Sequence, residues 1–247
     1  MSAITPIIKP WSQDNLNRCA FDEIPSYWEV YDVLTFLVEL EVYVPSLYHV
    51  LNDFEKEQEH EFKTEYFKKR FTVSRSINKF ILQNILKTQA ISDIDLSMKI
   101  NRRIIVKNRQ DIFISQSYSG TYIAISIGKR KIGSDIEAIC PARIKNNNSY
   151  PLFNDMNYRS EKERIRTFLH KWTMIEAYAK LHDKNPYPYL NSAFLPEDAH
   201  FISYCINQHS ILSLAFRQHT LKDIVLWIDP RCIEKVHSEM NNAANSS

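Results

Sequence analysis

Apolar and polar residues alternate in several short segments of the chain, which is the period of a β-strand with one face toward a core. In the clearest segment, 33–44, apolar residues occupy every second position from 38 onward, and Pro45 ends the strand because it cannot donate to a sheet ladder. The other strands that this pattern predicts are 112–115, 122–127, 132–137, 200–206 and 210–216.

Two long helices accompany these strands. Between 64 and 87, apolar residues follow helical spacing while lysine and arginine side chains face elsewhere. Asn52, followed three residues later by Glu55, predicts a capping box for a helix just upstream. The second long helix contains the run 168–180.

A faint internal repeat relates two parts of the chain. The segment 113–115, followed by an alternating strand, resembles 201–203, which is followed by another. The repeat indicates two related α+β halves, whereas a length of 247 residues by itself allows one large domain or two small ones. The expected divisions are an N-terminal extension at 1–32, halves at 33–129 and 130–236, and a flexible tail at 237–247.

Acidic residues mark the segment 132–137 and the second long helix. On a strand, Asp135 and Glu137 project from one face, with side chains roughly 6–7 Å apart. The helix adds Glu176, with Lys180 one turn later on the same face. Three carboxylates without His or Cys suit a hard cation such as Mg²⁺, which usually bridges to the phosphates of a substrate. These residues therefore predict a diphosphate site.

Each of these residues also has a structural interpretation. An Asp-x-Glu pair on a strand commonly faces solvent, and a Glu–Lys pair four residues apart on a helix contributes only about 0.2–0.5 kcal/mol. Scattered cations such as Lys63, Arg75 and Arg103 are usually solvated. The order of these residues along the chain, rather than any one of them, carries the functional information.

The glycines are few and close together. Only three occur, Gly120, Gly128 and Gly133, and all lie within fourteen residues beside the carboxylates. We expect each to be required by a positive φ or by a close approach of the backbone.

Composition excludes several classes of protein. The 31 basic and 29 acidic residues give a net charge of +2, which is too balanced to predict a nucleic acid partner. The four cysteines lie far apart, which favours free thiols over disulfides. No stretch approaches eighteen apolar residues, and the start lacks the pattern of a secretion signal. We expect a soluble, cytoplasmic protein without a membrane partner.

Four segments of the chain match one family in consistent order. In that order they resemble the motifs of 4′-phosphopantetheinyl transferases of the large monomeric, surfactin-synthetase-activating type, and the resemblance covers about residues 33–220. The segments are Lys69-Arg-Phe-Thr-Val-Ser-Arg75, Ser117-Tyr-Ser-Gly120, Gly133-Ser-Asp-Ile-Glu137 and Trp172-Thr-Met-Ile-Glu-Ala-Tyr-Ala-Lys180. The resemblance implies a monomer of two pseudo-symmetric halves, each a small antiparallel sheet packed on a long helix, with the site between them.

The resemblance also assigns roles to individual residues. It implies that Asp135, Glu137 and Glu176 hold Mg²⁺. It further implies that Glu176 is the general base for the attacking serine and that Lys180 is the cation beside the diphosphate. The residues in positions where the family contacts coenzyme A are Lys63, Arg75, Arg103, Ser117 and Tyr118.

The sequence departs from the family pattern in three places. Tyr118 stands where the family has a histidine, Arg102-Arg103-Ile104 replaces a Gly-Lys-Pro turn, and Ile175 replaces a lysine next to the metal-binding glutamate. A cation roughly 4 Å from a phosphate is worth about 4 kcal/mol at an effective dielectric of 20, so the change at Ile175 bears most on activity. Lys171, one turn earlier, is the candidate for supplying the missing charge.

The resemblance therefore predicts a Mg²⁺-dependent enzyme of secondary or lipid-like metabolism. Such an enzyme transfers 4′-phosphopantetheine from coenzyme A to a serine of an acyl or peptidyl carrier protein. The alternative is a catalytically weak or inactive homologue that binds coenzyme A or a carrier protein as a regulatory module. A plain α+β interaction protein, with the motifs present by coincidence, is the third possibility.

Overall fold

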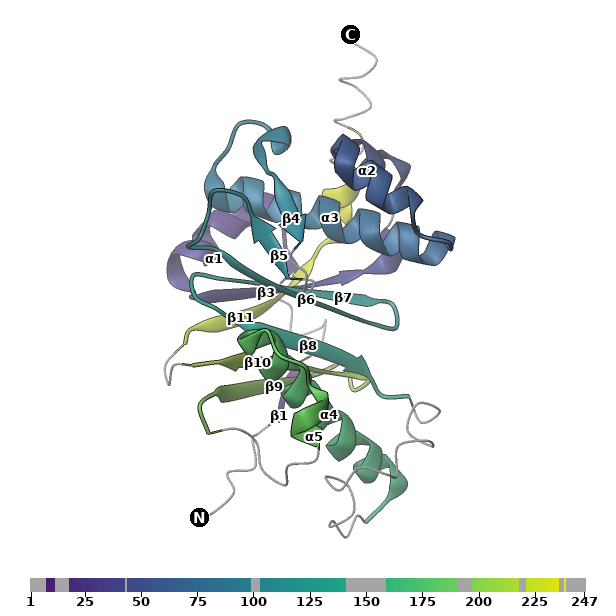
Figure 1. The fold of residues 1–247 in the computed structure, drawn as a ribbon, viewed down its shortest axis with the longest axis vertical. Helices are drawn as coiled ribbons and strands as arrows, with labels where there is room; N and C mark the ends of the chain where they lie inside the picture. The colour runs from purple at the N-terminus through teal and green to yellow at the C-terminus, as the bar shows by residue number, and fades with distance from the viewer. Residues whose placement is uncertain are drawn as a thin grey trace.

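Two β-sheets lie face to face in a computed structural model of the protein, and a long helix covers the outer side of each (Figure 1). The structure describes residues 8–11, 18–42, 44–98, 103–140, 159–190, 197–217, 221–235 and 238. The chain is α+β, as its pattern of strands and helices predicts.

Strands and helices follow one another without regular alternation. The strands are β1 (Ile8–Trp11), β2 (Arg18–Cys19), β3 (Val33–Glu39), β4 (Leu96–Met98), β5 (Ile104–Val106), β6 (Phe113–Ser119), β7 (Tyr122–Gly128), β8 (Gly133–Ala138), β9 (His200–Ile206), β10 (Ser210–Phe216) and β11 (Asp223–Ile228). The helices are α1 (Ile24–Val30), α2 (Asp53–His60), α3 (Glu65–Leu86), α4 (Glu161–His182) and α5 (Tyr187–Leu190).

The first sheet has the strand order β2-β11-β3-β7-β6. Its central strand β3 is buried on both faces, because Leu34 and Phe36 pack in the core beneath α3 while Val33 and Leu37 pack in the core between the sheets. The predicted continuation of this strand to residue 44 is wrong. The ladder with β7 ends at Glu39, where β7 itself begins, and Leu40–Val42 forms a short 3₁₀ helix.

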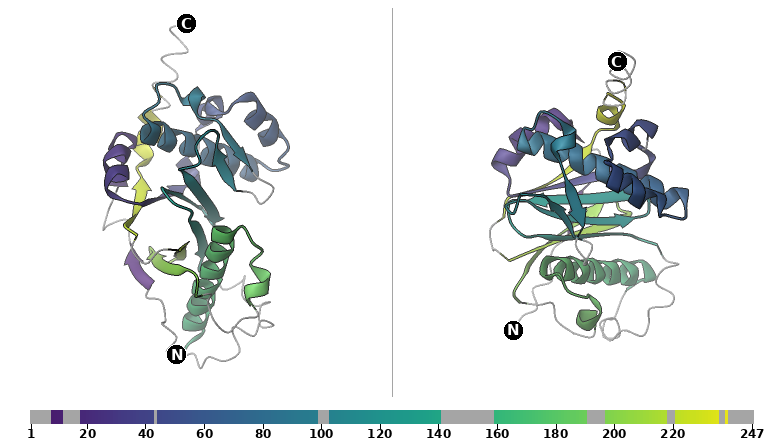
Figure 2. Two further views of the ribbon diagram at one scale, coloured as in Figure 1. Left: turned by 60° about the vertical axis from the view of Figure 1, so that its left-hand side comes forward. Right: turned by 45° about the horizontal axis from the view of Figure 1, so that its top comes forward.

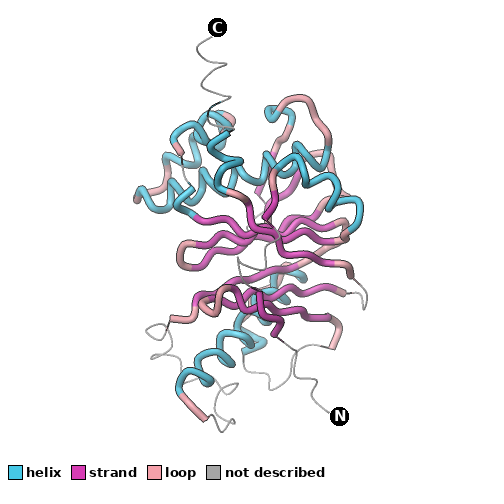
Figure 3. Tube along the Cα trace, turned by 180° about the vertical axis from the view of Figure 1, so that it is seen from behind, coloured by secondary structure: helices cyan, strands magenta, loops and turns pink. Residues whose placement is uncertain are grey.

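The second sheet has the strand order β1-β9-β10-β8 and is seen from behind in Figure 3. Alternate residues of β10 divide between two cores. Ile211 and Ala215 pack with residues of α4 on the outer side, whereas Leu212 and Leu214 face the first sheet. Helix α4 therefore lies outside the second sheet, as α3 lies outside the first.

Each sheet includes a strand from the opposite end of the sequence. Strand β11 pairs in parallel with β3 in the first sheet, and β1 pairs in parallel with β9 in the second. The sheets are therefore mixed, and the expectation of purely antiparallel sheets is wrong. The expected boundary at 129/130 falls between β7 and β8, yet each sheet also takes a strand from the opposite end of the chain.

The described residues of the expected extension at 1–32 are part of the fold. They form β1, β2 and α1, and Cys19 and Ile24 are fully buried in the first core. Local pattern could not indicate this, because these short strands pair with segments roughly two hundred residues away. Of the tail at 237–247, only residue 238 is described.

The long helices begin at polar caps. Thr64 caps α3 and Ser160 caps α4, so α4 starts two turns before the predicted run 168–180. The capping box ahead of α2 is confirmed, because Asn52 accepts from the Glu55 N–H at 2.9 Å and Glu55 accepts from the Asn52 N–H at 3.0 Å. All four cysteines are free thiols, as their spacing predicts.

Gly133 sets the distance between α4 and the second sheet. A Cβ atom at this position would lie 1.8 Å from the carbonyl oxygen of Ala177 and 2.6 Å from the backbone nitrogen of Leu181. The helix backbone therefore lies directly on β8, along which it runs in Figure 2. Gly120 has a φ of +58°, so both positions meet the expectation for glycine.

None of the helices in the described part of the chain is both long enough and apolar enough to cross a lipid bilayer.

Replacing Gly133 with alanine should destabilise the protein by about 3 kcal/mol or more, because the added methyl group overlaps the backbone of α4, which cannot move independently. Gly120→Ala is the control, because an added Cβ there would make only an ordinary contact with Ala138 at 3.8 Å and the positive φ, worth about 1–2 kcal/mol, is what opposes a side chain. Urea unfolding measures the loss in the free energy of unfolding of both variants. A smaller loss for Gly133→Ala than for Gly120→Ala would contradict the close approach of α4.

Candidate functional site

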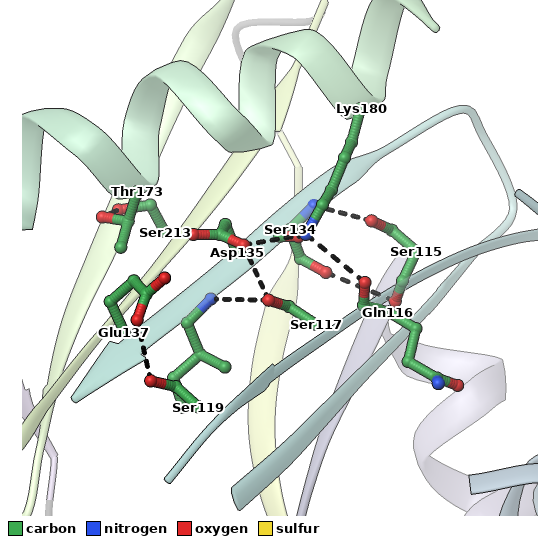
Figure 4. A network of polar contacts seen from close by, with 11 residues as sticks. Ser115, Gln116, Ser117, Ser119, Ser134, Asp135, Glu137, Thr173, Lys180 and Ser213 are labelled. Atoms are coloured by element: carbon green, nitrogen blue, oxygen red, sulfur yellow. Dashed lines mark hydrogen bonds and ion pairs between the residues drawn. The ribbon is translucent and has the colours of Figure 1, made fainter. Parts of the chain in front are cut away.

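Strands β6 and β8 connect the two sheets through serine side chains (Figure 4). Each of three alternate serines on β6 accepts a hydrogen bond from a backbone N–H of β8. The pairs are Ser115 with Ser134 at 2.8 Å, Ser117 with Ile136 at 3.3 Å and Ser119 with Ala138 at 2.6 Å. In a parallel sheet, backbone carbonyls would accept these bonds, so hydroxyls replace them here. We call this arrangement the serine junction.

Lys180 reaches into the serine junction from α4. Its Nζ donates to the carbonyl oxygens of Gln116 on β6 at 3.3 Å and Ser134 on β8 at 3.0 Å, and to Oδ1 of Asp135 at 2.8 Å. These three acceptors match the three donors of an ammonium group. Lys180 therefore binds both strands and compensates the charge of Asp135.

Asp135 and Glu137 share one face of β8, as their spacing on a strand predicts, and both side chains point toward β6. Ser117 donates to Oδ1 of Asp135 at 2.6 Å, and Ser119 donates to Oε2 of Glu137 at 2.8 Å. Burial, the largest cause, and the charges of Asp135 and Glu137 raise the pKa of Glu176 on α4 to about 7 against the opposing effect of Lys180. All three carboxylates therefore lie within electrostatic reach of one another.

The chemistry of these carboxylates fits a hard cation. They offer oxygen donors only, and Oδ2 of Asp135 is buried without a hydrogen-bond partner, so the protein leaves one ligand atom unused. In the described part of the chain, however, no three His, Cys, Asp or Glu side chains are grouped so that they could hold a metal ion. The three carboxylates are neighbours that share a suitable chemistry, but their side chains are not arranged as a ligand set.

Ser117 and Tyr118 face opposite sides of β6. Ser117 lies in the serine junction, while the hydroxyl of Tyr118 bonds to Oγ of Ser74 on α3 at 3.1 Å and to the side chain of Gln116. The guanidinium of Arg70 lies 4.2 Å from the centre of the Tyr118 ring. Burial raises the pKa of Tyr118, so its hydroxyl stays neutral. Tyr118 thus belongs to the packing of α3 on the first sheet.

Two of the predicted coenzyme A contacts lie away from the serine junction. Arg75 is only 2% exposed, with its guanidinium 5.3 Å from the ring of Phe71 and its Nη1 buried without a hydrogen-bond partner. Lys63 is exposed just ahead of α3, the helix on the far side of the first sheet from α4. In this arrangement the Arg75 guanidinium is enclosed and does not reach a surface ligand.

Arg103 lies at one end of the serine junction. Its guanidinium donates to Asp183 at 3.0 Å and to the carbonyl oxygen of Ile132, directly before β8, at 3.4 Å. Burial lowers the pKa of Arg103 against the opposing charge of Asp183. It also borders a surface cavity of about 710 Å³ whose wall includes Lys107 and Phe113. Among the predicted contacts, Arg103 and Ser117 are the two that the structure places at the junction.

Ile175 does not face the carboxylates. It is 2% exposed and packs against Leu190 of α5. At about 100° per residue, Lys171 lies on that same side of α4 and half a turn around the helix from Lys180. The idea that Lys171 supplies the charge missing at Ile175 is therefore not supported by the helix geometry.

Sequence reasoning missed part of this site. Ser115, Ser119 and Asp183 all contact residues of the site. Of the three serines, the sequence predicts a site role for Ser117 alone. Serine at every second position of β6 was the available signal, because it places three hydroxyls on one face of a strand.

Glu176→Gln tests the shared environment of the carboxylates. The folded protein keeps a proton on Glu176 up to about pH 7, whereas the unfolded chain loses it near 4.5, the ordinary pKa of a glutamate. The free energy of unfolding therefore falls as the pH rises through this window. The variant has no titrating carboxyl at position 176 and therefore lacks this loss of stability. We expect its stability relative to the unmodified protein to be about 1–2 kcal/mol greater at pH 8 than at pH 4, a range reduced for partial solvent exposure.

Urea unfolding at the two pH values measures this difference. Glu61→Gln is the control, because Glu61 is an exposed carboxyl at the end of α2. If Glu176→Gln followed the same pH profile as the unmodified protein, the raised pKa would be refuted.

Comparison with known proteins identifies no family for this chain. No family model matches the chain, and no curated protein matches it significantly. The interpretation of the site therefore depends on the residues themselves.

Proposed function

We propose that the protein transfers 4′-phosphopantetheine from coenzyme A to a serine of an acyl or peptidyl carrier protein in a Mg²⁺-dependent reaction. The observation that carries this proposal is the meeting of Asp135 and Glu137 on β8 with Glu176 and Lys180 on α4. These residues come from two distant segments, and their order and spacing are those of the resembled family.

Glu176 has the properties of a general base. A base works best when its pKa is near the working pH, and the pKa of Glu176 is raised to about 7 by burial and by its acidic neighbours. It would accept the proton of the attacking carrier serine. For Asp135, Glu137 and Glu176 to hold Mg²⁺, their side chains would have to turn toward one point when the ion binds, and the ion would then supply positive charge to the diphosphate.

Lys180 would support the departing nucleotide. Negative charge grows on the leaving phosphate as the phosphoryl bond breaks, and preorganised positive charge stabilises it. The ammonium lies at the mouth of the serine junction with a side chain that is 31% exposed, so it is accessible from solvent. Arg103, at the same end of β8, would add a second cation.

The alternative is binding of coenzyme A or a carrier protein without catalysis. One observation favours it: Lys180 already uses its three donors within the protein, while Ile175 supplies no replacement charge because it is buried against α5. A homologue of this kind would keep the substrate surface and lose transition-state stabilisation.

We also propose that the two layers are related halves of a duplicated unit. Each consists of a mixed sheet with one long helix on its outer side. The repeated segments 113–115 and 201–203 lie in β6 and β9, and each of these strands pairs antiparallel with the next strand along the chain.

A transfer assay distinguishes the two functions. Apo carrier protein, coenzyme A and Mg²⁺ are incubated with the protein, and we expect the carrier to gain the mass of one phosphopantetheinyl group. Glu176→Gln should slow the transfer by about a hundredfold or more, because it removes the general base.

Glu61→Gln, which changes an exposed carboxyl, should transfer at the unmodified rate. Binding of coenzyme A without a gain in carrier mass would support the alternative, and absence of both would reject both functions.

A further inference from the structure

Three cations surround a small cavity at the edge of the second sheet. Arg130 and Lys131, from the turn between β7 and β8, and Arg217, directly after β10, line a cavity of about 160 Å³ together with Phe216 and Leu221. No carboxylate is among these lining residues. The cavity is thus a basic recess with an apolar wall.

The register of the sheet brings these cations together. Strands β8 and β10 are antiparallel, and Ala215 lies opposite Gly133, so Lys131 and Arg217 continue the two strands to the same end. Like charges on facing positions destabilise a sheet. An anion between them would remove this repulsion.

The neighbouring charges leave the recess strongly positive. Asp183 is shared, with Oδ2 at 2.6 Å from Nζ of Lys131 and 3.0 Å from the guanidinium of Arg103. Arg217 contacts His182 at 3.3 Å, and Nε2 of His182 lies 3.5 Å from Asp198. Burial lowers the pKa of His182, so the ring stays neutral and adds no further positive charge. The four cations Arg103, Arg130, Lys131 and Arg217 thus face two carboxylates, Asp183 and Asp198, and the recess keeps a net positive charge.

We propose that this recess binds a phosphate monoester group or free phosphate. A phosphate carries nearly two negative charges at pH 7, and its size fits a cavity of this volume. Arginine is suited to it because the planar guanidinium donates two parallel hydrogen bonds to a phosphate. Phe216 and Leu221 exclude water from one side, which strengthens the attraction.

This site is separate from the carboxylate site. Lys131 precedes Asp135 by four residues, or roughly 13 Å of extended chain. Lys131 pairs instead with Asp183, and Arg217 contacts His182. Phosphate binding here does not require the transfer reaction, so either proposal can fail without the other.

Thermal unfolding with inorganic phosphate tests the proposal. At equal ionic strength, saturating phosphate should raise the Tm by about 2–4 °C relative to chloride. The double variant Lys131→Ala/Arg217→Ala should lower the phosphate affinity about a hundredfold, because two charged hydrogen-bond donors are lost. The control Lys56→Ala/Lys87→Ala removes one cation on α2 and one directly after α3, both in the part of the fold that covers the first sheet, and should leave the affinity unchanged.

A pair of nucleotides identifies the source of the phosphate. Coenzyme A and dephospho-coenzyme A differ by one phosphate monoester; tighter binding of coenzyme A that the double variant abolishes would assign the recess to a nucleotide. Equal binding of the two, together with stabilisation by inorganic phosphate, would assign it to the free ion. Equal Tm values in phosphate and chloride, or a phosphate response that survives in the double variant, would overturn the proposal.

Discussion

The hydroxyls of three serines on β6 hold the two halves of the molecule together where the candidate site forms. They accept the backbone N–H groups of β8 and so take the place of carbonyl oxygens. Each such bond contributes about 0.5–1.5 kcal/mol. Because Ser117 and Ser119 also donate to Asp135 and Glu137, the same hydroxyls that join the sheets orient the carboxylates.

The replacement of carbonyl acceptors by serine hydroxyls explains the position of Lys180. Carbonyl oxygens that an ordinary ladder would use are available to its ammonium, which binds one from each strand together with Asp135. The close contact of α4 at Gly133 brings Lys180 and Glu176 within reach of β8. The site is therefore a consequence of how two sheets and one helix meet.

Local sequence period predicted the parts of the site that depend on neighbours in the chain. The shared face of Asp135 and Glu137 follows from strand geometry. The scarcity of glycine indicated that position 133 is special, but its cause, the backbone of α4 at Ala177, lies in a distant segment. The enclosure of Arg75 and the pairing of β1 and β11 depend on contacts between distant segments, which no local pattern contains. From the sequence alone a basic residue in a helix is expected to face solvent, because the segments that cover it are distant in the chain.

We propose that the three carboxylates turn toward one another to share a divalent ion with a diphosphate when both are bound. Electron paramagnetic resonance with Mn²⁺ in place of Mg²⁺, in the presence of coenzyme A, tests it most directly. We predict one bound Mn²⁺ per chain with coupling to phosphorus nuclei, and loss of that signal in Asp135→Asn. Mn²⁺ that stays free, or that binds without phosphorus coupling, would contradict the claim.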